Sequence, residues 1–246
     1  MNNQSIIKQL KALSIVIGLI PCVGFSGWFS EEVVDKTTNV VFIDYSISSA
    51  TLKDNNPSRL RKQLEDIYND ANEMDDIIIY PIHNHTEIAV PMLHIEKQKL
   101  PGNMNDKQLN KTYRKDFLGQ VDDILITNLK MDENVRMGTN IYPIVRKLSR
   151  YHKDENLKVW IVSDMQHEYT NELLHIDLAE KNVDPAQHAK NIVLDKKYQN
   201  KLANIEVMIE FTETCDYRSQ VLRSKLEDFW EEFFNMTGAV VSFNYL

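Results

Sequence analysis

Short runs of apolar and β-branched residues alternate along this chain with stretches in which apolar residues recur every three or four positions. One such run covers residues 38–43 and ends at Asp44, and similar runs cover 76–82, 157–162 and 205–211. Each run has the length of a buried strand, and each intervening stretch has the spacing of a helix. This alternation predicts an open, largely parallel α/β sheet.

The same patterns place the remaining elements. A turn at 83–86 predicts a third strand at 87–94, antiparallel to the strand before it. The final strand is expected at 239–245. Helices are predicted from Asn55-Asn56-Pro57, from about Lys111, over 141–148, after Asp184-Pro185 and over 222–233. The expected fold class is α/β: a Rossmann-like open, mostly parallel sheet with one antiparallel strand and helices on both faces.

Composition excludes several classes of protein. Of 246 residues, 36 are acidic and 28 are Lys or Arg, so the formal net charge is −8. A protein that tracks nucleic-acid phosphates needs a basic surface, and this balance argues against one. The chain has only two cysteines, Cys22 and Cys215, which rules out a disulfide framework.

The first thirty residues predict a targeting segment. Lys8 and Lys11 precede an uncharged, largely apolar stretch at 12–30, after which Glu31 restores charge. A basic region followed by an apolar one is typical of an export signal. We therefore expect residues 1–30 to be a signal peptide or an N-terminal membrane anchor, and residues 31–246 to form a single exported domain. That domain would be periplasmic or extracellular, or anchored to the membrane by residues 12–30.

Three fates of this segment remain open at this stage. Pro21, Gly24 and Gly27 interrupt its second half, which favours cleavage over retention as an anchor. Cys22 follows apolar residues as in a lipoprotein signal, but Pro21 stands where such signals carry a small residue.

Oxygen-bearing side chains follow two of the predicted strands. Asp44, Ser46 and Ser48 alternate with apolar residues after the first strand, Thr139 follows Gly138 before a helix, and Asp164 ends the strand at 157–162. Ligands of open α/β sheets bind beyond the carboxyl ends of the strands. Two carboxylates and three hydroxyls suit Mg²⁺ or Mn²⁺ and do not suit zinc.

These residues resemble the metal-ion-dependent adhesion site of the von Willebrand factor A (VWA) family. Asp44-Tyr45-Ser46-Ile47-Ser48 is similar to the family's D-x-S-x-S element, and Thr139 and Asp164 are similar to its second and third elements. The chain departs from the family pattern in two places. Asp44 and Thr139 are 95 positions apart, which suggests an insertion at 95–135, and Met165 stands where many members carry glycine.

The resemblance implies a non-enzymatic, exported protein of bacterial type. In such a protein, a protein partner would supply an acidic residue to a bound Mg²⁺ or Mn²⁺. The charge balance predicts no nucleic-acid partner, and the N-terminal segment predicts membrane contact only through itself. Ser46, Ser48 and Thr139 would bind the ion directly, and Asp44 and Asp164 would bind it directly or through water. The alternatives are an Mg²⁺-dependent hydrolase or phosphotransferase on a similar sheet, or a scaffold whose metal site is unused.

Other residues are weaker candidates for chemistry. His83 and His85 have a spacing that could hold zinc, although solvated turn histidines are the expected explanation. His167 and Glu168 either flank the metal site or are simply exposed. Cys215 is expected to be a buried, inert thiol.

Overall fold

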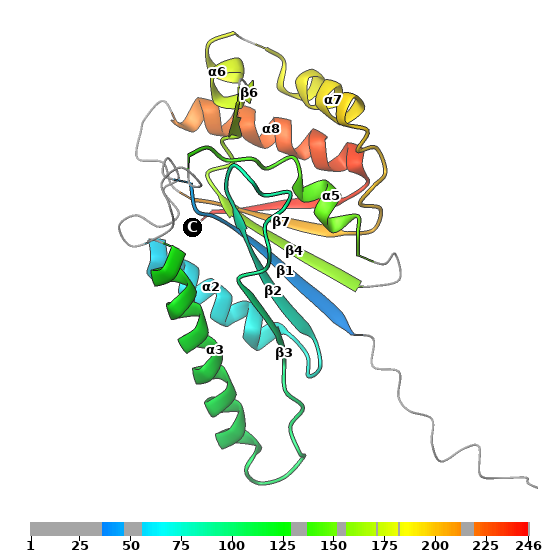
Figure 1. Ribbon diagram of the computed structural model, residues 1–246. Helices are drawn as coiled ribbons and strands as arrows, with labels where there is room; N and C mark the ends of the chain where they lie inside the picture. The colour runs from blue at the N-terminus through cyan, green and yellow to red at the C-terminus, as the bar shows by residue number, and fades with distance from the viewer. Residues whose placement is uncertain are drawn as a thin grey trace, which may run out of the picture. The chain divides into compact units, whose positions relative to one another are not determined.

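Six strands form one mixed sheet in the computed structural model (Figure 1). The structure describes residues 36–46, 56–128, 137–151, 156–170, 172–181, 183–212 and 219–245. The strand order across the sheet is β3-β2-β1-β4-β7-β8, and only β3 is antiparallel to its neighbour. The strands are β1 (Thr37–Asp44), β2 (Asp76–Ile82), β3 (Leu93–Glu96), β4 (Asn156–Ser163), β7 (Glu206–Phe211) and β8 (Val240–Tyr245).

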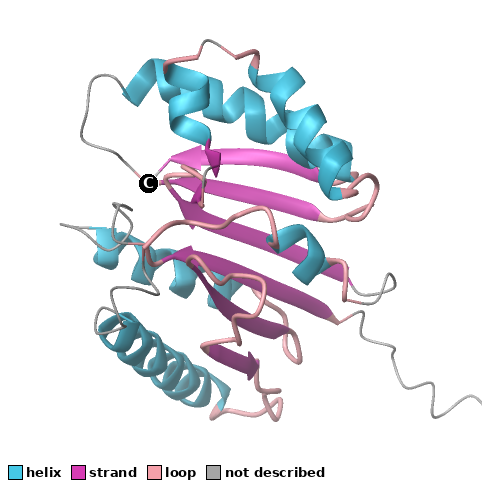
Figure 2. Cartoon of the chain, turned by 45° about the horizontal axis from the view of Figure 1, so that its top comes forward, coloured by secondary structure: helices cyan, strands magenta, loops and turns pink. Residues whose placement is uncertain are grey.

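Helices pack against both faces of this sheet (Figure 2). The side chains of Val41 and Ile43 join a core cluster with α2 (Asn56–Asp70) and α3 (Asp106–Asn128). Val40 and Phe42 point the other way, as alternation along a strand requires, into a second cluster. This second cluster contains α5 (Ile144–Leu148), α6 (Leu174–Ala179), α7 (Pro185–Lys196) and α8 (Ser219–Thr237). The predicted fold class is confirmed.

Strand β1 lies at the centre of the sheet and is buried along its whole length. It runs parallel to β2 on one side and to β4 on the other, with Asp44 opposite Ile82 and Ile43 opposite Val162. The carboxyl ends of the three strands therefore lie together at one end of the sheet, where the predicted site residues follow them.

The antiparallel strand lies later in the chain than predicted. The sequence pattern favoured 87–94, whereas β3 is Leu93–Glu96. The segment after β2 closes instead into turns, because the Thr86 hydroxyl accepts from the His83 N–H and donates to the His83 carbonyl. Ile88 and Val90, which looked like strand residues, are 77% and 76% exposed.

The polar connection after β4 is more structured than its composition suggested. A two-stranded hairpin, β5 (Glu168–Tyr169) and β6 (Glu172–Leu173), precedes α6. The helix predicted after Asp184-Pro185 is α7, whose first turn is capped by the Asp184 carboxylate accepting from the Gln187 N–H at 2.6 Å. Helix α3 also begins earlier than predicted, at Asp106.

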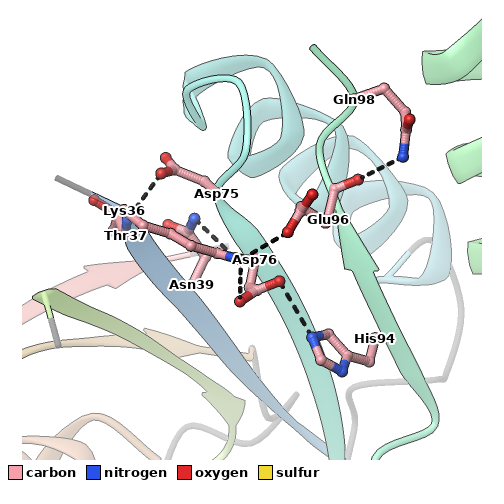
Figure 3. Close-up of polar contacts among 8 residues, drawn as sticks. All are labelled: Lys36, Thr37, Asn39, Asp75, Asp76, His94, Glu96 and Gln98. Atoms are coloured by element: carbon pink, nitrogen blue, oxygen red, sulfur yellow. Dashed lines mark hydrogen bonds and ion pairs between the residues drawn. The ribbon is translucent and has the colours of Figure 1, made fainter. Parts of the chain in front are cut away.

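Polar contacts fix the beginning of β1 at the opposite end of the sheet (Figure 3). Lys36 forms ion pairs with Asp76 and Glu96, and the Asp75 carboxylate accepts from the Thr37 N–H at 2.8 Å. No helix within the described ranges is long and apolar enough to span a bilayer. Residues 1–30, with the predicted targeting segment and Cys22, lie outside the described residues, as does Cys215. The division of the chain at residue 31 stays a prediction.

Candidate metal site

Asp44 and Ser46 stand at the carboxyl end of β1, where the central strand gives way to a loop. The two oxygens of Asp44 have separate partners: Oδ1 accepts from the Ser46 N–H at 2.9 Å, and Oδ2 accepts from the Ser163 hydroxyl at 2.7 Å. Asp44 is fully buried and Ser46 is 3% exposed. The carboxylate therefore holds the loop after β1 against the end of β4.

Burial raises the pKa of Asp44, because the charged form loses the solvation of water. The hydrogen bonds from Ser46 and Ser163 act in the opposite direction, and the nearby carboxylate of Glu168 raises the pKa further. A cation beside this group would favour its ionised form.

Asp164 follows β4 and is 5% exposed. Its Oδ1 accepts from the Gln166 N–H at 3.1 Å, which turns the loop back on itself. The residue between them, Met165, has a φ of +59°, in the left-handed region that glycine adopts most easily. Met165 therefore reproduces the backbone that a glycine would provide, and its own side chain is fully buried in the core.

Thr139 reaches the same end of the sheet on a segment that pairs with the loop after β4. Its N–H donates to the Glu168 carbonyl at 2.8 Å, and its carbonyl accepts from the Glu168 N–H at 2.9 Å. Gly138 makes this close approach possible, since its φ is +92° and a Cβ there would lie 2.5 Å from the Glu168 carbonyl oxygen.

The hydroxyl of Thr139 is buried without a hydrogen-bond partner among the described residues. Thr139 is 1% exposed, so water does not reach it freely. A buried hydroxyl that makes no hydrogen bond is costly, and native structures rarely keep one without a reason. A hard cation at this position would use that oxygen as a ligand, so the residues fit the ion that the sequence predicted.

Two histidines, absent from the predicted ligand set, support the Thr139 segment from either side. The His83 carbonyl accepts from the Asn140 N–H at 3.3 Å, and His167 Nδ1 accepts from the Ile141 N–H at 3.1 Å. His83 is 6% exposed and its Nδ1 accepts from the His85 N–H at 2.9 Å. The expectation that both turn histidines are solvated is therefore wrong for His83, which is a buried part of the turn.

His167 is fully buried, so the alternative that it is simply exposed is wrong. Its ring stacks on Tyr142 with 3.8 Å between centroids, and its Nε2 lies 3.3 Å from Glu172 Oε2. Since Nδ1 accepts a backbone N–H, the proton of the neutral ring belongs on Nε2, on the side of the ring that faces Glu172. The contact with His167 is the largest of the causes that lower the pKa of Glu172 to about 2, and Lys196 acts in the same direction.

The structure thus brings four of the five predicted residues to one end of the sheet. They are Asp44, Ser46, Thr139 and Asp164; Ser48 lies outside the described residues. Within the described part of the chain, no three His, Cys, Asp or Glu side chains gather as a metal-binding group. The donor set is therefore made of hydroxyls and two carboxylates, and the nitrogen and sulfur ligands that zinc prefers do not form a cluster there.

Sequence reasoning missed Ser163. Its hydroxyl donates to Asp44 and accepts from the Met165 N–H at 2.9 Å, so one side chain holds both loops of the site. Its place directly before Asp164, at the end of a strand beside β1, is the signal that could have identified it.

No protein-family model matches the chain, and no curated protein matches it. Several solved structures do. They include the ArnB paralog VWA2 from Sulfolobus acidocaldarius, with 14% identity, a TM-score of 0.44, and 87% of this chain and 42% of that one covered. A von Willebrand factor type A structure from Catenulispora acidiphila has 9% identity, a TM-score of 0.43, and coverages of 85% and 39%.

A third similar structure is proximal thread matrix protein 1 from the mussel byssus, with 11% identity, a TM-score of 0.41, and coverages of 84% and 42%. Zinc occupies the MIDAS motif in a second structure of that protein. The chain spans about two fifths of the length of these proteins. The chain has a VWA-like α/β fold: a mostly parallel sheet in the order β3-β2-β1-β4-β7-β8, with only β3 antiparallel and helices on both faces.

Proposed function

We propose that this protein is a binding module that captures a protein partner through a divalent cation, Mg²⁺ or Mn²⁺, at the carboxyl end of its sheet. Ser46, Ser48 and Thr139 would hold the ion directly, and Asp44 and Asp164 would bind it directly or through water. A hard cation with a position left open attracts a carboxylate, so an acidic residue of the partner would complete the shell.

The buried hydroxyl of Thr139 is the observation that carries this proposal. A buried hydroxyl without a hydrogen-bond partner, at the same end of the sheet as the buried carboxylates of Asp44 and Asp164, costs folding energy unless a ligand uses it. The choice of a binding role over catalysis rests on Ser46. An Mg²⁺-dependent phosphotransferase on a similar sheet, with an aspartate at the end of its first strand, needs a second carboxylate two residues later as its general acid, and Ser46 occupies that position.

Thr139→Val tests the site. Valine has the shape of threonine without the hydroxyl, so the metal-free variant should be as stable as the parent or slightly more stable. With millimolar Mg²⁺ or Mn²⁺ the parent should melt at a higher temperature by mass action, whereas the variant should lose most of that increase. Thermal melts in EDTA and in each ion, with calorimetric titration, measure both effects.

Thr237→Val is the matched control. Thr237 is also buried, but its hydroxyl donates to the Phe234 carbonyl at 2.6 Å. This variant should be less stable by about 1 kcal/mol and should keep the full response to metal. If neither ion changes the melting temperature of the parent, the proposal is contradicted. The better explanation would then be a scaffold protein whose metal site is unused.

We also propose that residues 1–30 direct export, because a basic start followed by an uncharged apolar stretch is typical of such segments. A reporter enzyme that is active only outside the cytoplasm, fused after Ser30, should be active. The mass of the purified protein would then distinguish cleavage, retention as an anchor, and lipid attachment at Cys22. An inactive fusion would remove the export proposal.

A further inference from the structure

Among the described residues, no helix covers one half of the sheet on the side where α2 lies. Residues 158, 160, 206 and 208 occupy the outward positions of β4 and β7 on this side and are exposed or half-buried, while their neighbours Val159 and Val207 are buried under α8. Val240, on β8, is 65% exposed. Parallel strands are normally covered on both faces, so an open face on β4, β7 and β8 is unusual.

A groove of about 600 Å³ lies over this open face. Its wall is the side of α2 that carries Asp66 and Asp70, and its floor is formed by β1, β4, β7 and β8. Strand register places Trp160, Met208 and Ser242 in one row across the floor, and Lys158, Glu206 and Val240 in the next row. The floor is therefore partly apolar and partly charged.

The width of this face corresponds to one helix. Neighbouring strands lie about 4.8 Å apart, so β4, β7 and β8 together span about 10 Å. An α-helix with its side chains has a diameter of about 10 Å. A helix laid beside α2 would cover Trp160, Met208 and Val240 at once.

The charge of the groove selects the kind of helix. Asp66, Asp70 and Glu206 are exposed, and their side-chain carboxylates form no hydrogen bond or ion pair with the described part of the chain. Asp66 and Asp70 are four residues apart on α2, where two like charges repel each other. Lys158 is the one basic residue among those that line the groove.

Glu210 adds a carboxyl group to the floor of the groove. It is 7% exposed, and its Oε1 lies 3.5 Å from the amide nitrogen of Asn244. Burial raises its pKa, and amide groups of Asn244 and Gln63 offset this only in part. A cationic side chain from outside would supply the counter-charge that the groove lacks.

We propose that the groove between α2 and the open face of β4, β7 and β8 docks a helical segment of a protein partner, with an apolar stripe flanked by lysine or arginine. The groove is lined mainly by the first halves of the strands, whereas the candidate metal site lies at their carboxyl ends. This surface is therefore separate from the metal site and would bind its partner without metal.

A synthetic amphipathic helix of leucine and lysine is the probe. Added to the full chain in EDTA, it should shift the fluorescence of Trp160, and calorimetry should give a single saturable binding event. The same helix with glutamate in place of lysine should not bind. In a Trp160→Phe variant the fluorescence shift should disappear while calorimetry still detects binding.

Paired charge reversals distinguish the groove from general attraction to an acidic protein. Asp66→Lys with Glu206→Lys should weaken binding about tenfold or more, because like charges then face each other across the contact. Asp123→Lys with Glu180→Lys changes the net charge equally at exposed positions outside the groove and should have little effect.

Three results would overturn the proposal. One is an equal loss in the two double variants, and another is binding of both probes alike. The third is self-association of the chain that Asp66→Lys and Glu206→Lys abolish, since the occupant would then be a second copy. None of these readouts depends on the metal site, so the two proposals stand or fall separately.

Discussion

Gly138 and Met165 both hold left-handed backbone beside the candidate metal site, for different reasons. At Gly138 a side chain is excluded, because a Cβ would meet the Glu168 carbonyl. At Met165 the buried side chain packs in the core and offsets the cost of a φ of +59°. The sequence showed the glycine next to Thr139, but nothing in it indicated that a methionine could adopt the backbone that glycine provides elsewhere.

Gly138→Ala should disrupt the backbone pairing between Thr139 and Glu168. The added methyl group must displace the Glu168 carbonyl or force the loop out of its conformation, which should cost about 1–3 kcal/mol. Thermal melts should also show a smaller response to Mg²⁺, because Thr139 moves with the loop. Gly119→Ala is the control: Gly119 lies in α3 with nothing within 4 Å of its added Cβ, so it should stabilise the protein by about 0.5–1 kcal/mol. Equal effects of the two changes would contradict this account of Gly138.

His83 should make the protein less stable in mild acid. Burial lowers the pKa of His83 from 6.5 to about 4, with the charges of His85 and Lys147 acting in the same direction. The unfolded chain therefore takes up a proton near pH 6.5 while the folded chain does not until about pH 4. The free energy of unfolding is therefore unaffected by His83 above pH 6.5, falls as the pH drops below 6.5, and is lower by about 3 kcal/mol once the pH reaches 4.

His83→Asn tests this contribution. Asparagine can still accept the His85 N–H and cannot be protonated. The denaturation midpoint of the variant should therefore fall less steeply than that of the parent between pH 6.5 and 4. His167, whose pKa is also lowered by burial, would account for part of the slope that remains. His85→Gln, at the exposed neighbouring position, should leave the slope of the parent almost unchanged. A parent and a His83→Asn variant with parallel pH profiles would refute the assignment.

At the scale of elements, α8 supports the site through a hydrogen bond from Trp230. Trp230 Nε1 donates to the Met165 carbonyl at 2.9 Å, and the tryptophan is fully buried among Phe229, Phe233 and Phe234. The amphipathic pattern predicted this helix and its buried face. It could not predict the bond, because the partner lies 65 residues away and only the packed structure brings it close.

Trp230→Phe should keep the aromatic packing and leave the Met165 carbonyl without its donor. We expect a loss of about 1–2 kcal/mol in stability and a weaker response to metal, since the loop bearing Asp164 loses an anchor. Denaturant titrations with and without Mg²⁺ measure both. Phe233 is also buried, but its side chain makes no hydrogen bond to this loop. Phe233→Leu should therefore lower the stability and leave the stabilisation by Mg²⁺ unchanged. If both variants lose that response equally, the hydrogen bond is not the cause.

Long periodic elements were predictable and short irregular ones were not. The central strands and the helices α2 and α8 followed from apolar spacing, since burial on one face imposes it, and α7 followed from its start signal Asp184-Pro185. The hairpin of β5 and β6 is two residues long on each side, too short for any period to appear. The antiparallel strand was misplaced because the apolar residues Ile88 and Val90 belong to an exposed turn segment held by Thr86.

At the scale of the whole molecule, strand order is what gathers the site. Asp44 and Asp164 are far apart in sequence but follow neighbouring parallel strands, so the rule for open sheets was enough to predict their meeting. The groove could not be foreseen in the same way. Whether a face of the sheet is covered depends on where all the helices pack, and this cannot be predicted from the pattern of any one segment.

The central position of β1 has a mechanical consequence. Its last residue, Asp44, belongs to the candidate site, its first follows the predicted targeting segment, and seven residue pairs on each side join it to β2 and β4. A pull transmitted from a partner at one end to a tether at the other would run along the strand. The hydrogen bonds on both flanks would then be sheared together and not opened one after another. A chain built in this way is suited to stay folded under tension.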